Sequence, residues 1–452
     1  MDLPEIERLL AEHEVEVVKV GGADMDGVLR GKRILRDSFV EGCRNGGFPQ
    51  CDVIFGWDIQ EQLIDGVGVG GADTGFADII MQPDLATLRL VPWEERTAAV
   101  LCDYAHEDGR PVAVSPRQVL RRVIARAKDA GYRPRTAVEL ELRLFREDQR
   151  SLREKGYTGL TPLSPGLNCY SLHHASLDED VVGRIRRLMI EYGVPIEGYN
   201  REHGEGMYEL NIHYGDALTA ADQAHLYKSG VKEVAAQCGV VPTFMAKYDD
   251  QVDGCSGHLH QSLWSEDGER NLFWDEDAPQ HTSELLQAYT AGALATLPEF
   301  MLMYAPNVNS YKRLVPGSWA PTNVTWGFDN RTVALRVIAG SHTASRIENR
   351  VPGADVNAYL GFAATLVGGL HGIQRKLSAP AATQGNAYQA NEAPALPRSL
   401  DEAIERFADS AIAREYFGDE FVDQYAHMRQ WEADAFSRAV TGWERRRYFE
   451  QV

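Results

Sequence analysis

The chain has 452 residues, of which 44% are hydrophobic and 25% are charged, and its formal net charge is −20. This composition predicts a globular protein with enough apolar side chains for one large or two ordinary domains. The acidic excess argues against a nucleic-acid-binding protein, because such a surface needs a basic patch that displaces phosphate counterions.

The first part of the chain predicts short helices and strands. In chain order these are a helix at 5–14, a strand at 15–20, a turn-rich hairpin region at 21–31 that leads into 32–35, and strands around 79–81 and 98–101. The glycine-rich stretch 66–75 predicts a flexible surface loop. A boundary near 108–111 would separate a domain at 1–108 from a second domain at 109–452.

The second part alternates strands that carry polar residues with longer helices. Ser115 followed by Pro116 predicts the capped start of a helix. Further helices are expected at 217–238, 282–297 and 400–414. This organisation predicts the α+β fold class. We find no internal repeat.

The acidic amino-terminal segment lacks the apolar core of a signal peptide, and no apolar run approaches the ~20 residues needed to cross a bilayer. The six cysteines are scattered without the spacing of a disulfide framework or a zinc site. We therefore expect a cytoplasmic protein without a membrane anchor.

Glu139 and Glu141 are separated by one residue in an apolar run, so both carboxylates project from the same face of a predicted strand. Two carboxylates side by side repel each other unless a cation lies between them. The alternative is a solvated strand face, which is the more common explanation for such a motif standing alone.

Other acidic residues and histidines favour the cation. Glu202 and Glu209 flank a tight glycine turn that could fold both carboxylates toward one site, and His258 and His260 share one strand face. Glu348 lies between two arginines, a pattern that alone most often marks a surface ion pair. Together these oxygen-rich ligands suit a hard divalent ion such as Mg²⁺ or Mn²⁺.

The most informative motif is the run from Asn309 to Pro321, which reads NSYKRLVPGSWAP and is followed by Asn330-Arg331-Thr332. It resembles the glutamine synthetase superfamily, and within it the enzymes that make γ-glutamyl amides of polyamines and other amines. The resemblance extends from about Val18 to the end of the chain. It implies a small amino-terminal β-grasp domain and a larger catalytic domain built on a curved antiparallel sheet.

The resemblance also implies site residues. Two Mg²⁺ or Mn²⁺ ions would be held by two sets of ligands, Glu141, Glu202 and Glu209 for one ion, and Glu139, His258 and Glu348 for the other. ATP would contact His260, Ser262, Arg331, Arg336 and Arg346, and glutamate would contact Asp253, Gly254, Arg313 and Arg350. Arginines suit these roles because a planar guanidinium binds two phosphate or carboxylate oxygens at once.

The chain departs from the family pattern at the residues next to the expected substrates. Trp319 occupies the position at which the family carries a Glu that receives ammonium and its proton. The asparagine before Gly254 is replaced by Asp253, and Glu205 and Met207 replace a proline and a glutamine. A tryptophan offers no base, but its flat face suits the methylenes of an alkylamine or a cationic nitrogen.

We therefore expect an ATP-dependent ligase that joins the γ-carboxylate of glutamate to a polyamine or another alkylamine through γ-glutamyl phosphate. Arg331 would stabilise the reacting phosphoryl group, and Glu205, or Asp58 from a neighbouring subunit, would accept the proton of the amine. The resemblance implies a dodecamer of two hexameric rings. Tyr388 is the nearest match to the tyrosine that many bacterial glutamine synthetases adenylylate, but the surrounding residues give little reason to expect that control.

Two alternatives remain open from the sequence. One is an ammonia-using glutamine synthetase in which another group compensates for the missing Glu. The other is a catalytically silent family member with a structural or regulatory role, in which the metal and arginine residues would have no function.

Overall fold

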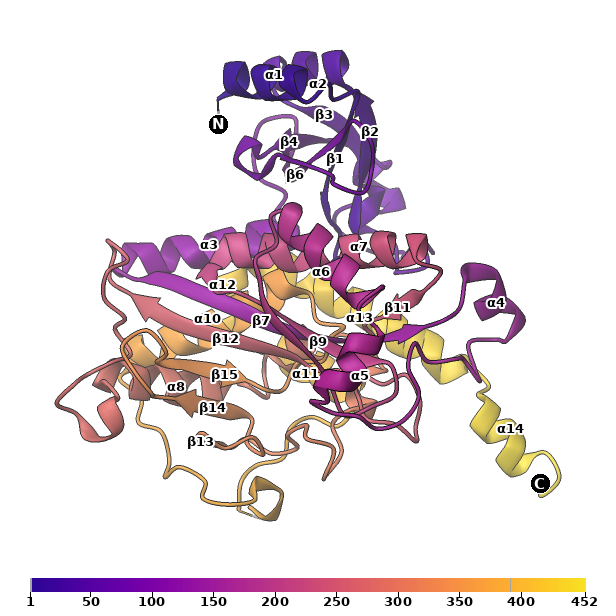
Figure 1. The fold of residues 1–452 in the computed structure, drawn as a ribbon. Coiled ribbons are helices and arrows are strands. Elements are labelled where there is room, and N and C mark those ends of the chain that lie inside the picture. Colours follow the sequence, from indigo (N-terminus) through magenta and orange to yellow (C-terminus); the bar gives the residue numbers. More distant parts are fainter. Residues whose placement is uncertain (1, 391) are drawn as a thin grey trace.

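The computed structural model describes residues 2–390 and 392–452, which form two β-sheets with helices between and around them (Figure 1). The smaller sheet belongs to the amino-terminal part of the chain, and the larger sheet forms the centre of the remainder. The α+β class is confirmed, and the two sheets agree with a small amino-terminal β-grasp unit and a larger unit with a curved sheet. The division into 1–108 and 109–452 stays a prediction.

The amino-terminal sheet has the strand order β2-β1-β6-β4-β3, with β5 paired to β6. Its strands are β1 (Val17–Ala23), β2 (Leu29–Leu35), β3 (Phe48–Cys51), β4 (Asp78–Pro83), β5 (Arg89–Leu90) and β6 (Thr97–Ala105). The hairpin strand β1 pairs in parallel with β6 and antiparallel with β2. Helices α1 (Leu3–Glu12) and α2 (Arg36–Arg44) lie at the far end of this domain (Figure 1).

The larger sheet has the order β13-β14-β15-β12-β7-β9-β8, and the short strands β10 and β11 also pair with β7. Its strands are β7 (Arg133–Phe145), β8 (Ile196–Arg201), β9 (Met207–Ile212), β10 (Gly215–Asp216), β11 (Val241–Thr243), β12 (Gly257–Trp264), β13 (Trp326–Phe328), β14 (Leu335–Ile338) and β15 (Arg346–Asn349). Neighbouring strands run antiparallel except for β13 and β14, which run parallel.

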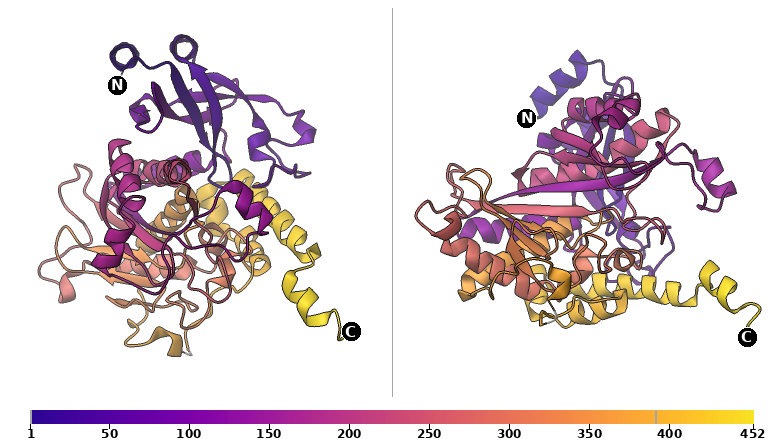
Figure 2. Two further views of the ribbon diagram at one scale, coloured as in Figure 1. Left: turned by 45° about the vertical axis from the view of Figure 1, so that its right-hand side comes forward. Right: turned by 60° about the horizontal axis from the view of Figure 1, so that its bottom comes forward.

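Helices cover the larger sheet on the side that faces the amino-terminal domain (Figure 1). The helices are α3 (Pro116–Asp129), α4 (Gln149–Glu154), α5 (Leu172–Leu177), α6 (Val182–Glu191), α7 (Ala217–Gln237), α8 (Glu284–Thr296), α9 (Met301–Tyr304), α10 (Ala358–Arg375), α11 (Leu400–Ala408), α12 (Ala411–Phe417), α13 (Asp419–Arg438) and α14 (Gly442–Tyr448). Short 3-10 helices are η1 (Asp52–Phe55), η2 (Ala72–Thr74), η3 (Leu85–Thr87), η4 (Pro279–His281), η5 (Ser310–Lys312) and η6 (Ala387–Gln389). The carboxy-terminal α14 projects away from the body of the molecule (Figure 2).

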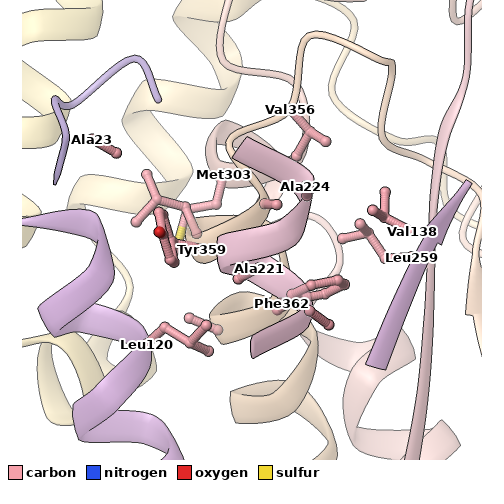
Figure 3. Packing of buried hydrophobic residues seen from close by; sticks show 14 of the residues in the cluster. Ala23, Leu120, Val138, Ala221, Ala224, Leu259, Met303, Val356, Tyr359 and Phe362 are labelled. Carbon is pink, nitrogen blue, oxygen red and sulfur yellow. The ribbon is translucent and has the colours of Figure 1, made fainter. Parts of the chain in front are cut away.

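The alternation of β7 explains how the sheet separates its core from its polar face. Val138, Leu140 and Leu142 are buried, and Figure 3 shows Val138 and Leu259 of β12 pointing toward Phe362 of α10. Because successive side chains of a strand point to opposite faces, the residues between these apolar positions project from the other side of the sheet. The helix-covered face is therefore the core, and the opposite face is free for polar chemistry.

A buried polar network joins the two domains around Arg117 of α3. Its guanidinium donates to Asp222 at 2.8 and 2.9 Å, and to Asp84 and Asp103 at 2.8 Å each. Tyr359 also donates to Asp222, at 2.6 Å. Since the two domains share one arginine and its carboxylates, the amino-terminal domain is held in a fixed place on the catalytic domain.

Four local predictions differ from the structure. The hairpin strands extend further than expected, because Gly21 pairs with Gly31, where an added Cβ would lie 2.0 Å from the Val20 carbonyl oxygen. The stretch 66–75 is a surface loop only in part, since Val67, Val69, Gly70 and Gly71 are buried. The Val69 N–H donates to Gln424 at 2.8 Å.

The other two differences concern helix ends. Ser115 does precede α3, but its hydroxyl makes no capping hydrogen bond. The helix expected at 400–414 is broken after Ala408, because the Ser410 hydroxyl accepts from the N–H of Ala413 and starts α12. A serine at a helix start satisfies an otherwise unpaired backbone donor, which favours this second start over a continuous helix.

Within residues 2–390 and 392–452, no helix is both long and apolar enough to cross a membrane. The six cysteines are all free thiols.

Candidate active site

The polar face of the larger sheet borders a cavity of about 790 Å³. Of the residues singled out from the sequence, fourteen line it, namely Glu139, Glu141, Glu202, Met207, Glu209, Asp253, Gly254, His258, Arg313, Trp319, Arg331, Arg336, Glu348 and Arg350. They come from strands β7, β9, β12, β14 and β15 and from the loops that follow β8 and η5. One cavity therefore collects side chains that are more than 200 positions apart in the sequence.

Three carboxylates gather at one side of this cavity. Glu141 of β7 and Glu209 of β9 stand opposite each other in register, and oxygens of Glu141, Glu202 and Glu209 lie within 4.8 Å of one another. Asn200 donates to Glu202 at 2.7 Å, and the Ser256 N–H donates to Glu141. The strand pairing thus forces three acidic groups into one small space.

The pKa values of Glu141 and Glu209 are raised in this crowded group. Burial raises the pKa of Glu141 to about 7, with repulsion from Glu202 acting in the same direction. Burial also raises the pKa of Glu209, reinforced by repulsion from Glu139 and Glu141. A divalent cation at this position would remove the repulsion and favour the ionised carboxylates.

A second group of possible metal-ligating side chains lies on the neighbouring strands β7, β12 and β15. The Nδ1 atom of His258 is 3.3 Å from both Glu139 and Glu348, and the Nε2 atom of His260 is 3.0 Å from Glu139. Ligand atoms of Glu139, His260 and Glu348 lie within 4.8 Å of one another. The structure therefore offers either histidine to an ion held by the two glutamates, whereas the resemblance implied His258 alone.

Arginines balance the charge of this second group. Arg350 donates to Glu348, and Arg336 donates to Glu348 at 2.9 Å. Burial alone would raise the pKa of Glu348, but His258 and Arg350 hold the pKa at about 2. Burial lowers the pKa of His258 to about 4, so its imidazole is neutral and able to ligate a metal at neutral pH.

The residues present fit divalent metal ions. The Nε2 atom of His258 is buried without a hydrogen-bond partner among the described residues. In the first group, burial and mutual repulsion raise the pKa values of Glu141 and Glu209, which a cation would counteract. The donors are oxygens and imidazole nitrogens, which suit Mg²⁺ or Mn²⁺ better than a thiolate-seeking metal.

A second cavity of about 450 Å³ lies next to the first, and Glu139 lines both. It contains three residues expected at the nucleotide, His260, Ser262 and Arg346, and the Arg346 guanidinium donates to His260 at 3.0 Å. Sequence reasoning did not identify Arg135, whose guanidinium lies 4.2 Å from the ring centre of Trp264 and 5.8 Å from that of Tyr214. The alternating Arg-Pro-Arg-Thr at the start of β7 was the only signal for it.

The cavity wall around Gly254 is closely packed. An added Cβ on Gly254 would lie 2.5 Å from the Ala246 carbonyl oxygen and 2.8 Å from Arg313, so a larger residue does not fit there. Arg313 is buried and donates to the Val351 carbonyl at 3.0 Å, which fixes the guanidinium beside the glycine. Asp253 accepts a hydrogen bond from His203 at the same place.

Trp319 lies at the open end of the main cavity. Its side chain is 60% exposed, and its φ of 61° is in the left-handed region, which is unfavourable for a tryptophan. Strain of this kind persists where the surrounding structure holds the residue and is common at ligand-binding sites. The Arg331 side chain lines the same cavity and is exposed.

Two expected residues do not line either cavity. Glu205 is exposed and accepts from the Gly166 N–H at 2.7 Å. Asp58 is buried in its own loop, where the N–H groups of Gln60 and Gln62 donate to it at 2.8 Å each. The structure therefore does not bring either candidate proton acceptor to the cavity.

Three further residues that the sequence did not single out also line this cavity. They are Cys169, Tyr170 and His203. The Cys169 sulfur is 3.9 Å from Glu202, and Tyr170 is largely exposed with a φ of 57°. No periodic pattern marks this loop, so only its three-dimensional position reveals its place at the site.

The fold and the site define an α+β protein whose paired carboxylate groups and facing arginines form a site for divalent cations and phosphates. Residues 113–448 match the family model of the glutamine synthetase catalytic domain. The chain belongs to the glutamine synthetase family.

Several characterised relatives are similar over nearly the whole chain. The glutamate–isopropylamine ligase of Pseudomonas sp is 41% identical over 98% of this chain and 97% of its own length. The γ-glutamylethanolamide synthetase of Streptomyces coelicolor is 41% identical over 100% and 96%. The type-1 glutamine synthetase 2 of Dictyostelium discoideum is 42% identical over 96% and 84%.

Among solved structures, that of GmaS in complex with ADP superimposes with a TM-score of 0.86 at 27% identity, covering 99% of both chains. The predicted relationship to the γ-glutamyl-amine synthetases within the glutamine synthetase family is confirmed by these matches.

Proposed function

We propose that this protein is an ATP-dependent carbon–nitrogen ligase that joins the γ-carboxylate of glutamate to an amine and forms ADP and phosphate. The observation that carries the proposal is the placement of Trp319 at the open end of a cavity otherwise lined by carboxylates and arginines. A flat apolar wall suits the carbon atoms of an amine, whereas it offers no carboxylate to accept a proton from an ammonium ion.

The relatives support an organic amine as the acceptor. Two of them are named for ligation of isopropylamine and for synthesis of γ-glutamylethanolamide. The acidic chain and the carboxylates near the cavity favour a cationic amine, and a polyamine is the acceptor that we infer.

The first step is activation of glutamate. Arg313 and Arg350 would hold the carboxylates of glutamate, and the γ-carboxylate would attack the γ-phosphorus of ATP to give γ-glutamyl phosphate and ADP. Arg331 would stabilise the charge on the transferred phosphoryl group, since its side chain lines the cavity without a carboxylate partner among the described residues. His260, Ser262, Arg336 and Arg346 would bind the nucleotide.

The second step is attack of the neutral amine on the γ-carbonyl carbon. Phosphate leaves, the carbon–nitrogen bond forms, and the amine nitrogen loses a proton. Glu205, or Asp58 from a neighbouring copy in a dodecamer of two hexameric rings, is our candidate for the proton acceptor. The exposed Ile59 and Leu63 next to Asp58 support a contact between copies.

The two carboxylate groups would hold the metal ions, Mg²⁺ or Mn²⁺, with Glu141, Glu202 and Glu209 in one set and Glu139, His258 and Glu348 in the other. Such ions neutralise negative charge on phosphate oxygens as it develops in the transition state. The free cysteines support a reducing compartment, and we infer the cytoplasm.

Ammonia is the competing acceptor, because the relative from Dictyostelium discoideum is named a glutamine synthetase at 42% identity. The test measures phosphate release and γ-glutamyl product with ATP, glutamate and Mg²⁺ for ammonium, putrescine, spermidine, ethanolamine, isopropylamine and aniline. Product with an amine and little with ammonium supports the proposal. If turnover with ammonium equals or exceeds turnover with every amine, the protein is a glutamine synthetase and the proposal is wrong.

The same assay addresses a catalytically silent protein. If no acceptor releases phosphate, equilibrium binding of Mn²⁺ and of ADP decides. Absence of both would mean that the carboxylates and arginines have no catalytic role.

A further inference from the structure

Residues 383–390 and 392–396 contact two of the loops that contribute residues to the main cavity. We call these residues the bridging segment. At one end, Asn330 donates to the Gly385 carbonyl at 2.8 Å, and the Ala387 N–H donates to the Thr332 hydroxyl at 2.9 Å. Asn330 and Thr332 flank Arg331, so this end of the bridging segment holds the loop that carries the phosphate-facing arginine.

The other end of the bridging segment holds the loop of Trp319. The Val324 N–H donates to the Pro394 carbonyl at 2.8 Å, and the Leu396 N–H donates to the Thr322 carbonyl at 2.9 Å. These hydrogen bonds lie three to five positions after Trp319 in the chain. One segment therefore contacts both the loop expected at the phosphoryl group and the loop expected at the amine.

Tyr388 of η6 lies between these two ends in the chain and contacts the Trp319 loop directly. Its hydroxyl donates to the Ala320 carbonyl at 3.1 Å, and Ala320 is fully buried although its neighbour Trp319 is exposed. Burial raises the pKa of Tyr388, so the hydroxyl stays protonated and able to donate. The hydrogen bond thus fixes the backbone immediately after the residue with the unfavourable φ.

The backbone before Trp319 is held as well. The Ser318 hydroxyl donates to the Arg313 carbonyl at 2.9 Å and to the Val315 carbonyl at 2.7 Å. Trp319 is therefore a residue whose backbone is tied on both sides while its indole remains free. Holding the backbone is what allows an unfavourable φ to persist and keeps the indole at one place on the cavity rim.

We infer that Tyr388 is a positioning residue for amine selection, which holds the Trp319 loop in register with the Arg331 loop through its hydrogen bond to Ala320. The inference rests on the proposed function, because it assumes that the amine binds at Trp319. Tyr388 does not touch a substrate. It acts through the placement of the indole.

The first test is Tyr388→Phe, which removes the hydroxyl and keeps the ring. We expect kcat/KM for the preferred amine to fall about five- to tenfold, the effect of losing one hydrogen bond at a held site. The KM values for ATP and glutamate should stay within about twofold, because Arg313 and Arg346 do not depend on Tyr388. The ratio of kcat/KM for the amine to kcat/KM for ammonium should fall by the same factor.

Tyr416→Phe is the matched control. Its hydroxyl donates to Gln374 at 3.0 Å and does not line either cavity, so none of these kinetic constants should change. If Tyr388→Phe raises the KM of all three substrates together, Tyr388 has a general structural role and the inference is wrong.

A second measurement does not require turnover. Acrylamide quenching of the Trp319 emission is obtained as the difference between the wild type and Trp319→Phe, and again between Tyr388→Phe and the double variant. We expect a larger quenching constant for Trp319 when the Tyr388 hydroxyl is absent. Equal quenching with unchanged amine selectivity would overturn the inference, whereas wild-type enzyme that ligates no amine would overturn the proposed function and leave the quenching result valid.

Discussion

The two ends of the main cavity are held by different kinds of structure. At one end, Glu139 and Glu348 project from paired strands and are surrounded by buried histidines and arginines. At the other end, Trp319 stands on a loop, is largely exposed and has an unfavourable backbone conformation. If the proposed function holds, the comparison teaches that the carboxylates expected at the metal ions are placed mostly by the sheet, while the choice of acceptor rests on a loop that can change without disturbing them.

The strand-built end should be the less tolerant of substitution. Glu348→Gln removes the charge that balances Arg336, Arg350 and the nearby histidine, so turnover should fall on the order of 10³-fold. Leaving the buried Arg350 without its charged partner should also lower the free energy of unfolding by about 3 kcal/mol. Steady-state kinetics and urea unfolding measure the two effects.

Asp222→Asn is the control, since Asp222 is also a buried carboxylate paired with a buried arginine but lies outside the cavity lining. It should lower stability by a similar amount, about 3 kcal/mol, with turnover per folded molecule retained. Unchanged turnover of Glu348→Gln would contradict the assignment of this end to the reaction.

The pH dependence of the metal-free protein should distinguish the two carboxylate groups within the strand-built end. The pKa of Glu141 is raised from 4.5 to about 7, so between these values the folded chain binds more protons than the unfolded chain. The stabilisation from protonated Glu141 is therefore complete below pH 4.5 and lost as the pH rises through about 7, by about 3 kcal/mol. Glu209 acts in the same direction.

Urea unfolding at pH 5.5 and pH 8 in EDTA, and again with Mg²⁺, measures this effect. Mg²⁺ should flatten the pH dependence, because the ion takes the place of the protons, and Glu141→Gln should flatten it without metal. Stability that rises with pH over this range in EDTA would contradict the cation site. Glu348, whose pKa is held at about 2, loses its contribution only in acid, as the pH falls below its unfolded value.

A substitution at the loop-built end should alter the selectivity for the acceptor without altering the first step of the reaction. Trp319→Glu should shift the ratio of kcat/KM for amine to that for ammonium about 10- to 100-fold toward ammonium, because it restores a carboxylate that attracts the cation. Competition between the two acceptors, with product analysis, measures the ratio. Trp443→Glu, at an exposed tryptophan of α14 outside the cavity, should leave the ratio unchanged.

The smallest expected effect is on stability at the same position. Trp319→Gly relieves the unfavourable φ and removes a side chain that buries little, so the free energy of unfolding should rise by up to about 1 kcal/mol although amine selection is lost. Trp319→Ala keeps a Cβ at the same φ and should show no gain. A stability loss with glycine larger than with alanine would mean that the conformation of this loop is not strained.

The sequence predicted the strand-built end well for a physical reason. The period of two in β7 places Glu139 and Glu141 on one face and their apolar neighbours in the core, and that relationship is fixed by the backbone alone. The α+β class follows from such alternation, whereas the family resemblance rests on the run from Asn309 to Pro321, which lies on η5 and in the loop after it. The individual roles of the site residues stay predictions.

The loops were less predictable, because their positions depend on contacts that are distant in the sequence. The stretch 66–75 has the composition of a surface loop, yet Gln424 from α13 fixes Val69 in the interior. The left-handed φ of Trp319 and the hydrogen bond from Tyr388 to Ala320 leave no periodic signal. The same holds for Tyr170, which reaches the cavity from a loop without regular structure.

Glu139 borders both cavities, and this has a thermodynamic consequence for how strongly each substrate binds when the other is present. A charge placed in one cavity changes the field felt in the other through a single shared carboxylate, so occupancy of either compartment alters the affinity of the other. Linkage requires the coupling to be reciprocal. If nucleotide tightens the hold on the amino acid by some factor, the amino acid must tighten the hold on nucleotide by the same factor, and both factors should shrink together when the shared carboxylate is neutralised.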